Sequence, residues 1–151
     1  MTPSEQALLD VLNSAPVVDG RIVETLADPE TARLRDELHA VIRGETEAAV
    51  LAHHLDGVRK RPTLTSTGIE WMLDAPEGER GRAELVLEWA RIQEELPGRL
   101  RPCANPECNK FLIDHSKPNS ARWCSMSQCG NRMKARRHYA RAGQGATSRT
   151  R

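Results

Sequence analysis

The residues of this chain with the clearest chemistry are its four cysteines, which form two pairs of equal spacing. Cys103 and Cys108 make the first pair and Cys124 and Cys129 the second, with four residues inside each pair and fifteen between the pairs. This layout is typical of a four-thiolate zinc site, in which each pair supplies two ligands from one tight turn. Four thiolates leave no open position on the metal, so the sequence predicts one structural Zn²⁺ per chain.

Disulfides, free thiols and an iron–sulfur cluster are the alternatives to zinc. The first ten residues carry two carboxylates and no apolar stretch of the length found in a secretory signal, so we expect a cytoplasmic chain with reduced thiols. Iron–sulfur clusters also use thiolates, but their usual cysteine spacings differ from these. Unrelated buried cysteines would not be expected to form two evenly spaced pairs. Zinc is therefore the preferred interpretation.

Charge is distributed very unevenly along the chain. Residues 1–98 hold 10 Lys/Arg and 19 Asp/Glu, a net charge of −9, whereas residues 99–151 hold 12 and 2, a net charge of +10. From residue 115 to residue 151 there is no acidic residue. A basic segment of this kind favours nucleic acid as the partner, and the acidic half could screen it in the free chain. A solvated basic tail is the alternative.

The basic segment coincides with a predicted helix over residues 126–141. Ser125 and Gln128 have the spacing of a capping box, which places the start of the helix at the second cysteine pair. Met133 and Ala140 are seven residues apart and are expected to pack inward. Arginine on the open side suits phosphates and guanine edges, so we expect this helix to face nucleic acid, with double-stranded DNA preferred. The expected contacts are Arg122, Arg132, Lys134, Arg136, Arg137 and Arg141.

The residues around the cysteines resemble the CGNR zinc finger. The resemblance rests on Cys103-x4-Cys108, Phe111-x2-Asp114-x-Ser116, Arg122-Trp123-Cys124-Ser125-Met126 and Cys129-Gly130-Asn131-Arg132-x-Lys134-Ala135. Members of this family are bacterial proteins regarded as transcription regulators, and their finger is expected to bind DNA. The resemblance implies a structural motif that here comprises Asp114, Trp123, Gly130 and Asn131.

Two residues of this motif are short polar side chains next to predicted turns. We expect Asp114 to hydrogen-bond backbone or an arginine of the finger, and Asn131 to brace the start of the helix. The finger itself is predicted to be treble-clef-like, with short strands at Phe111–Ile113 and 122–123 between the cysteine pairs.

Residues 1–98 have the pattern of a mainly helical domain with one or two β-hairpins. Thr2 before Pro3 and Asp28 before Pro29 are helix start signals, and Gly44 is expected to end the second helix. Further helices are predicted over residues 46–56 and 82–96. The predicted fold class is therefore α+β, with an N-terminal domain at 1–98 and the zinc finger with its basic helix and tail at 99–151. Loss of Cys108 is then expected to unfold the finger and leave the first domain folded.

Two hairpins are predicted within the first domain. Asp19-Gly20 between apolar runs is a two-residue type I′ turn signal. A second hairpin is expected around Gly68, where Ile69, Trp71 and Leu73 alternate and predict one buried face. Trp71 is accordingly assigned to the core.

A second resemblance covers the start of the chain. Leu8-Leu9-Asp10-Val11-Leu12-Asn13, followed by Pro16-Val17-Val18-Asp19-Gly20-Arg21, is similar to the beginning of the ABATE domain, which usually precedes a CGNR finger. Proteins of this kind are regarded as stress-induced transcription regulators. Family members often have a longer N-terminal region than this chain.

Two other groups of residues are assigned to the surface. His53 and His54 are adjacent on a predicted helix, where side chains point about 100° apart, so we expect a surface pair that does not share a metal ion. Arg59, Lys60 and Arg61 precede a proline and are expected to form a solvated loop.

Three function classes remain open on sequence alone. A DNA-binding regulator is preferred, and an RNA- or protein-interaction finger is the alternative. Asp114-His115 between the cysteine pairs resembles part of an HNH nuclease, although fifteen residues are few for that hairpin, so we expect no enzyme. No apolar run approaches the length of a membrane span, and a homodimer is compatible with the sequence.

Overall fold

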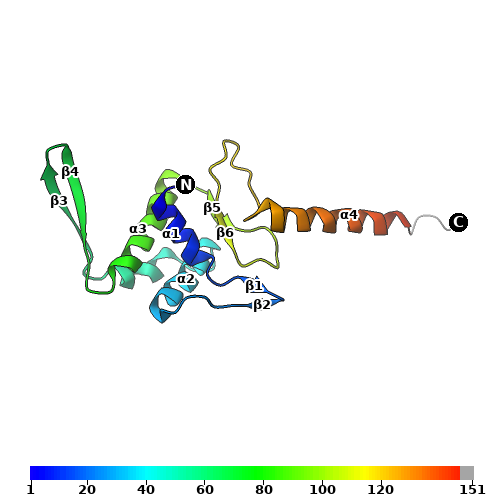
Figure 1. Ribbon diagram of the computed structural model, residues 1–151, viewed down its shortest axis with the longest axis horizontal. Coiled ribbons are helices and arrows are strands. Elements are labelled where there is room, and N and C mark those ends of the chain that lie inside the picture. Colours follow the sequence, from blue (N-terminus) through cyan, green and yellow to red (C-terminus); the bar gives the residue numbers. More distant parts are fainter. Residues whose placement is uncertain (147–151) are drawn as a thin grey trace.

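The computed structural model describes residues 1–146 and has the α+β fold that the sequence predicts. Helices α1 to α3 gather in one body, and helix α4 extends away from it (Figure 1). In chain order the elements are α1 (Pro3–Leu12), β1 (Val17–Val18), β2 (Arg21–Ile22), α2 (Pro29–Ile42), the 3₁₀ helix η1 (Ala48–Leu55), β3 (Arg59–Thr65), β4 (Gly68–Asp74), α3 (Arg80–Glu95), β5 (Leu100–Pro102), β6 (Phe111–Ile113), the π-helical turn η2 (Met126–Gly130) and α4 (Asn131–Ala146). Within this range no helix combines the length and apolar composition of a membrane span.

The first two helices begin and end where local chemistry predicts. The Thr2 hydroxyl accepts a hydrogen bond from the Glu5 amide, and the Glu5 carboxylate accepts one from the Thr2 amide, which completes the capping box of α1. Asp28 caps α2 through the Thr31 amide. Gly44 follows α2 with a φ of +73°, a conformation that glycine adopts at little cost.

The first hairpin is confirmed in its turn and its register. Val17 pairs with Ile22 and Val18 with Arg21. The two turn residues, Asp19-Gly20, have φ angles of 49° and 76°, as a type I′ turn requires.

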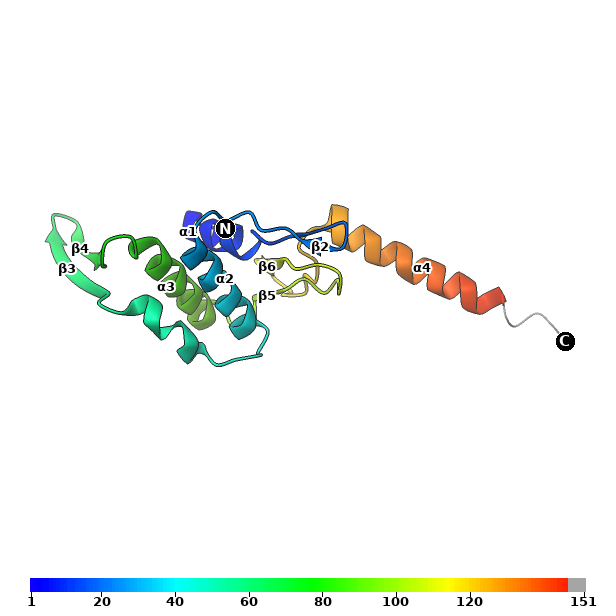
Figure 2. The same cartoon turned by 90° about the horizontal axis from the view of Figure 1, so that it is seen from below.

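One hydrophobic core joins the two halves of the chain. Leu8 and Leu12 of α1 pack in a buried cluster with side chains of α2, η1 and α3. Leu100, Phe111 and Ile113, from the β5–β6 hairpin that carries the first cysteine pair, belong to the same cluster. Both views place this hairpin beside α1 (Figures 1 and 2). The boundary at residue 98 remains a prediction from composition, but the finger does not bury its apolar hairpin alone.

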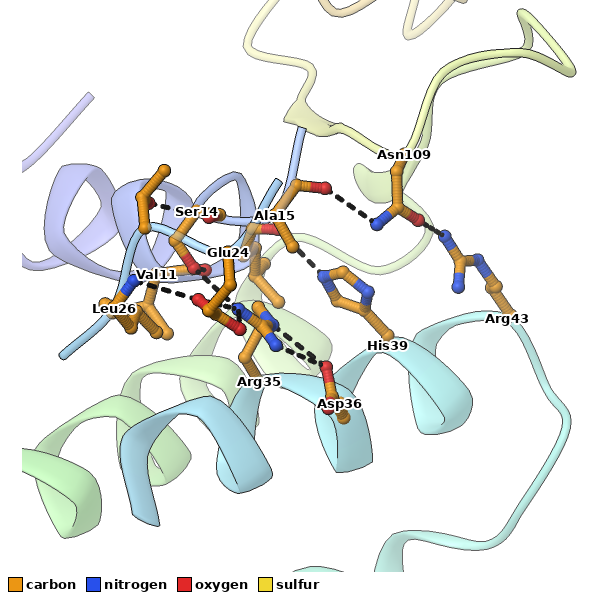
Figure 3. A network of polar contacts seen from close by, with 12 residues as sticks. Val11, Ser14, Ala15, Glu24, Leu26, Arg35, Asp36, His39, Arg43 and Asn109 are labelled. Atoms are coloured by element: carbon orange, nitrogen blue, oxygen red, sulfur yellow. Dashed lines mark hydrogen bonds and ion pairs between the residues drawn. The ribbon is translucent and has the colours of Figure 1, made fainter. Parts of the chain in front are cut away.

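Polar contacts reinforce this junction. Asn13, the C-cap residue of α1, accepts from the Phe111 amide at 2.7 Å and donates to the Phe111 carbonyl at 3.3 Å. Asn109 donates to the Ala15 carbonyl at 2.9 Å and accepts from Arg43 at 2.6 Å (Figure 3). Asn109 lies between Cys108 and β6, so these two hydrogen bonds tie this loop to the segment after α1 and to the end of α2.

His39 completes the junction from α2. Its Nε2–H donates to the Leu12 carbonyl at 2.8 Å, and its ring packs on Phe111 with 4.4 Å between centroids. Burial lowers the pKa of His39, so the imidazole is neutral at pH 7 and serves as a buried hydrogen-bond donor.

The second hairpin differs from its prediction in burial. β3 and β4 pair from Arg59 opposite Asp74 to Thr65 opposite Gly68, and the ribbon projects from the end of the body far from α4 (Figure 1). The prediction of a buried face, with Trp71 in the core, is wrong, because the Trp71 side chain is 63% exposed. The alternation does gather apolar residues on one face, but no element in residues 1–146 covers that face. The basic cluster Arg59, Lys60 and Arg61 was predicted to form a loop, but it belongs to strand β3.

Candidate metal centre and basic helix

The first cysteine pair lies on the loop that connects β5 to β6. Pro102 pairs with Phe111, and the Cys103 amide donates to the Lys110 carbonyl at 2.8 Å, so the ladder continues into the loop. The Cys108 amide donates to the Asn105 carbonyl at 2.9 Å, which folds Cys108 back toward Cys103. A tight knuckle therefore presents both sulfurs to one side.

The second pair brackets the start of the helical segment. The Ser125 hydroxyl accepts from the Gln128 amide, as the predicted cap requires. Cys124 precedes Ser125, and Cys129 lies in the π-helical turn that begins after Ser125. The Gly130 amide donates to the Ser125 carbonyl at 3.0 Å, and α4 follows directly.

Gly130 lies in a close approach to neighbouring side chains and has no unusual φ. A β-carbon at this position would lie 2.8 Å from the sulfur of Met126 and 3.3 Å from the Trp123 ring. Met126 is 53% exposed and the end of its side chain can move aside, so the half-buried indole of Trp123 is the firmer constraint on a larger residue. Trp123 and Gly130, two members of the predicted structural motif, therefore lie against each other.

The four sulfurs lie at separations that suit a tetrahedral zinc ion. The Sγ atoms of Cys108 and Cys124 are 3.7 Å apart, as are those of Cys124 and Cys129, and all four lie within 4.8 Å of one another. Zn–S bonds of about 2.3 Å place neighbouring sulfurs roughly 3.8 Å apart in a tetrahedron. No disulfide joins them. The four cysteines form a site able to hold one zinc ion, whose contribution there is structural, because four thiolates fill its coordination sphere.

The electrostatics of the four thiols also favour a bound cation. Burial and the charge of Cys108 raise the pKa of Cys124 strongly, and burial and the charge of Cys103 raise the pKa of Cys108. Four thiolates therefore coexist here only when a positive charge offsets their desolvation and mutual repulsion.

Asn105 supports the cluster and was missed by the sequence interpretation. Its side chain is buried, donates to Cys129 Sγ at 3.3 Å and accepts from the Glu107 amide. Burial opposes ionisation of Cys129, but hydrogen bonding from Asn105 helps to lower the pKa of this thiol. The signal in the sequence is the Asn-Pro dipeptide inside the first pair, which favours such a turn.

Asp114 organises the loop between the two pairs. Its buried carboxylate accepts from the amides of Ser116 and Ala121, each at 2.8 Å, and from Arg101 at 2.6 Å. These are contacts of the kind expected from the sequence. Hydrogen bonds from Ser116 and Ala121, with the charge of Arg101, lower the pKa of Asp114 to about 2 against the opposing effect of burial.

Two details of the predicted finger are wrong. Residues 122–123 form no strand; β6 pairs with β5, and only the Arg122 carbonyl bonds back to the knuckle, through the Ala104 amide. Asn131 is exposed, and no side-chain hydrogen bond of this residue is found within residues 1–146. The π-helical turn runs directly into α4, so Ser125 caps the whole segment and Asn131 has no free amides to brace.

The predicted basic contacts are exposed, but they do not share one face of α4. At about 100° per residue, Lys134, Arg137 and Arg141 fall within about 60° of one another, and Arg132 and Arg136 lie on the nearly opposite side. We call the first set the outer basic face. Arg136 reaches back to the knuckle and pairs with Glu107 at 2.6 Å, with both side chains about half exposed. This ion pair therefore links the Arg132 and Arg136 side of α4 to the finger.

Burial on α4 is less than predicted. Met133 is half-buried, but Ala140 is exposed, so the expected inward packing of Ala140 is wrong. Beyond its first part α4 extends away from the body of the molecule, as both ribbon views show (Figures 1 and 2).

These features define a small zinc finger in which a knuckle and the start of a helix each supply two thiolates. The family model for the CGNR zinc finger matches residues 99–142, which include all four cysteines and the first part of α4. The finger is thus similar to that family, whereas residues 1–98 lie outside the match. No curated protein matches the chain.

Proposed function

We propose that this chain is a cytoplasmic DNA-binding transcription regulator in which zinc fixes the base of α4 and α4 contacts the duplex. The observation that supports this proposal best is the position of α4. It extends from the metal centre into solvent (Figure 2), and its charged side chains through residue 141 are all basic. Phosphates are the natural counterpart of such a surface.

The outer basic face supplies the main contacts in this proposal. Lys134, Arg137 and Arg141 are exposed and point away from the knuckle, so phosphates can reach them without displacing an ion pair. Arg132 and Arg136 contribute less, because Glu107 competes for Arg136. Arg122 lies over the Trp123 ring at 5.3 Å and offers an outlying contact on the finger itself.

The proposal includes no catalytic role. Asp114 is engaged with two amides and Arg101, and His115 Nε2 lies 3.2 Å from a Glu5 carboxylate oxygen. The Asp114 carboxylate is thus occupied within the finger, and His115 faces Glu5 of α1. It supports a structural role for both residues.

The test is binding to a random DNA duplex, measured by fluorescence anisotropy over a range of salt concentrations. If about four to six phosphates are neutralised, the slope of log K against log salt is about −4 to −5. Replacing both Arg137 and Arg141 with alanine is expected to reduce this slope by about two. The pair Arg132→Ala and Arg136→Ala removes the same charge from the other side and is expected to have a smaller effect.

A control variant distinguishes an effect of α4 from a general effect of positive charge on DNA binding. Arg59→Ala with Arg80→Ala removes two exposed charges from the first half of the chain and should leave the slope unchanged. Zinc content is measured for every variant, so that loss of binding is not confused with loss of the metal. An outer-face variant that binds as tightly as the parent, with the same slope, contradicts the proposal. Tighter binding to RNA of the same sequence, or to no nucleic acid, would identify the partner as RNA or protein.

A further inference from the structure

A second group of metal-ligating side chains lies between α2 and η1, far along the chain from the cysteines. It consists of Glu37, His53 and His54, each of which places one potential ligand atom within 4.8 Å of the others. Nε2 of His54 lies 2.8 Å and Nε2 of His53 lies 3.6 Å from Oε2 of Glu37. The expectation that the histidines form a surface pair is wrong, because the His54 side chain is only 3% exposed.

The two imidazoles converge although they are adjacent in sequence. Their ring centroids are 3.9 Å apart and the planes are tilted by 39°, so the rings lie against each other. The segment that carries them is a 3₁₀ helix instead of the predicted α-helix. Adjacent residues of a 3₁₀ helix are about 120° apart, so the approach of the two rings comes from their side-chain torsions and not from the helix period.

The hydrogen bonds around the cluster leave two electron-pair donors facing each other. Nδ1 of His53 lies 2.9 Å from the Val50 carbonyl and must donate to it, so in the neutral ring the lone pair is on Nε2. That lone pair faces Oε2 of Glu37, which also carries negative charge. The two atoms are 3.6 Å apart, so both can act as ligands to one metal ion placed between them.

The surroundings resemble the outer shell of a metal site. Arg33 donates to Oε1 of Glu37 at 3.0 Å, which orients the carboxylate so that Oε2 faces both histidines. The Val50 carbonyl fixes the tautomer of His53, as second-shell acceptors do for metal-bound histidine. His53 is 39% exposed, and Glu37 and Val50 also line an open groove of about 670 Å³, so an ion can reach the cluster.

We propose that Glu37, His53 and His54 bind one divalent transition-metal ion, with zinc as the first candidate. With metal–ligand bonds of about 2.0–2.1 Å, tetrahedral ligand atoms lie roughly 3.3 Å apart, within the range of the distances seen here. Two imidazole nitrogens and one carboxylate oxygen make a three-ligand site that retains a position for water. Binding requires the other neutral tautomer of His54, in which the proton is on Nδ1 and the lone pair of Nε2 faces the metal. This site is independent of the cysteine centre and of DNA binding.

The test uses the tag-free full-length chain with one equivalent of zinc already present and its thiols shown to be protected from alkylation. Isothermal titration with Zn²⁺ is expected to reveal a second equivalent. His53→Ala and Glu37→Gln each remove a ligand and should weaken this second equivalent by at least about tenfold. His138→Ala removes an exposed histidine of α4 and should leave it unchanged.

His53 carries the decisive variant because its side chain is partly exposed and its loss leaves the core intact. Circular dichroism confirms that each variant is folded, and imidazole NMR signals of His53 and His54 should shift when the second equivalent is added. A parent chain that binds no second equivalent overturns the proposal. So does a His53→Ala variant that binds it as tightly as the parent.

Discussion

Replacing Asn13 with alanine tests whether α1 and the zinc finger fold as one unit. The Asn13 side chain makes two hydrogen bonds to the backbone of Phe111, whose residue surface is 1% exposed. Alanine leaves the Phe111 N–H without its partner, which costs about 1–3 kcal/mol, and removes a second hydrogen bond worth about 1 kcal/mol. Asn13 itself is half-buried, so water can reach part of the site, and we expect a total of about 2–3 kcal/mol.

This loss of stability should be visible in thermal unfolding of the zinc-loaded chain. For a protein of this size, 1 kcal/mol corresponds to about 2–4 °C, so Tm should fall by roughly 4–12 °C. Because Phe111 follows the first cysteine pair, Asn13→Ala should also release zinc faster to a chelator. Gln6→Ala is the matched control: Gln6 is exposed on the same helix and bonds only Asp10, so its loss should cost less than about 0.5 kcal/mol. An Asn13→Ala chain with the Tm and zinc-release rate of the parent would refute the coupling.

Three further predictions follow from the finger. Cys108→Ser should reduce bound zinc below half an equivalent and, because the β5–β6 hairpin lies in the common core, also lower the Tm of the helical body; an unchanged body would instead support the independent domains expected from composition. Asp114→Asn should destabilise the chain. Because the pKa of Asp114 is lowered to about 2, the stability that its carboxylate contributes is fully present above the unfolded pKa near 4 and is lost as pH falls through the folded pKa of about 2. The difference in urea midpoint between parent and variant should therefore be the same at pH 7 and pH 5, and a difference that shrinks over this interval would contradict the assignment. Glu107→Gln should free Arg136 and raise DNA affinity about two- to fivefold at low salt, as expected for a partly exposed ion pair, whereas lower affinity would show that Glu107 does not compete with phosphate.

Local signals predicted most of the fold and the cysteine ligands. Thr2, Asp28 and Ser125 cap their helices because capping depends on residues three positions away, and Asp19-Gly20 forms its turn for the same local reason. The two cysteine pairs were found because their spacing already contains the geometry of the knuckle and the helix start.

The errors concern properties that depend on distant parts of the chain. The alternation around Trp71 predicts which side chains share a face, but only tertiary structure decides whether another element covers that face. The partner of β6 was misassigned because strand pairing is not local: residues 100–102 lie before the cysteines, and residues 122–123 lie after them. The cluster around Glu37 was missed because it joins two elements, and because side-chain torsions, which the sequence does not give, bring the rings of His53 and His54 together.

The isolation of α4 affects how firmly its own hydrogen bonds are formed. α4 has 16 residues, and single helices of about 12–15 residues are only marginally stable in water without tertiary contacts. Its base is fixed by the turn at Cys129 and by the pair between Arg136 and Glu107, whereas Tyr139, Ala140 and Arg141 are exposed. Amide hydrogen exchange should therefore become faster from the base of α4 toward its far end.

This gradient of order has an effect on any partner that uses the whole helix. Contacts at Arg132 or Lys134 engage a segment that is already formed, but contacts at Arg141 carry an added entropic cost of holding the outer turns in place. Substitutions that raise helix propensity at exposed positions near Arg141 would then increase affinity without touching the partner. A partner that contacts the whole of α4 therefore binds preferentially to molecules in which the outer turns of the helix are formed.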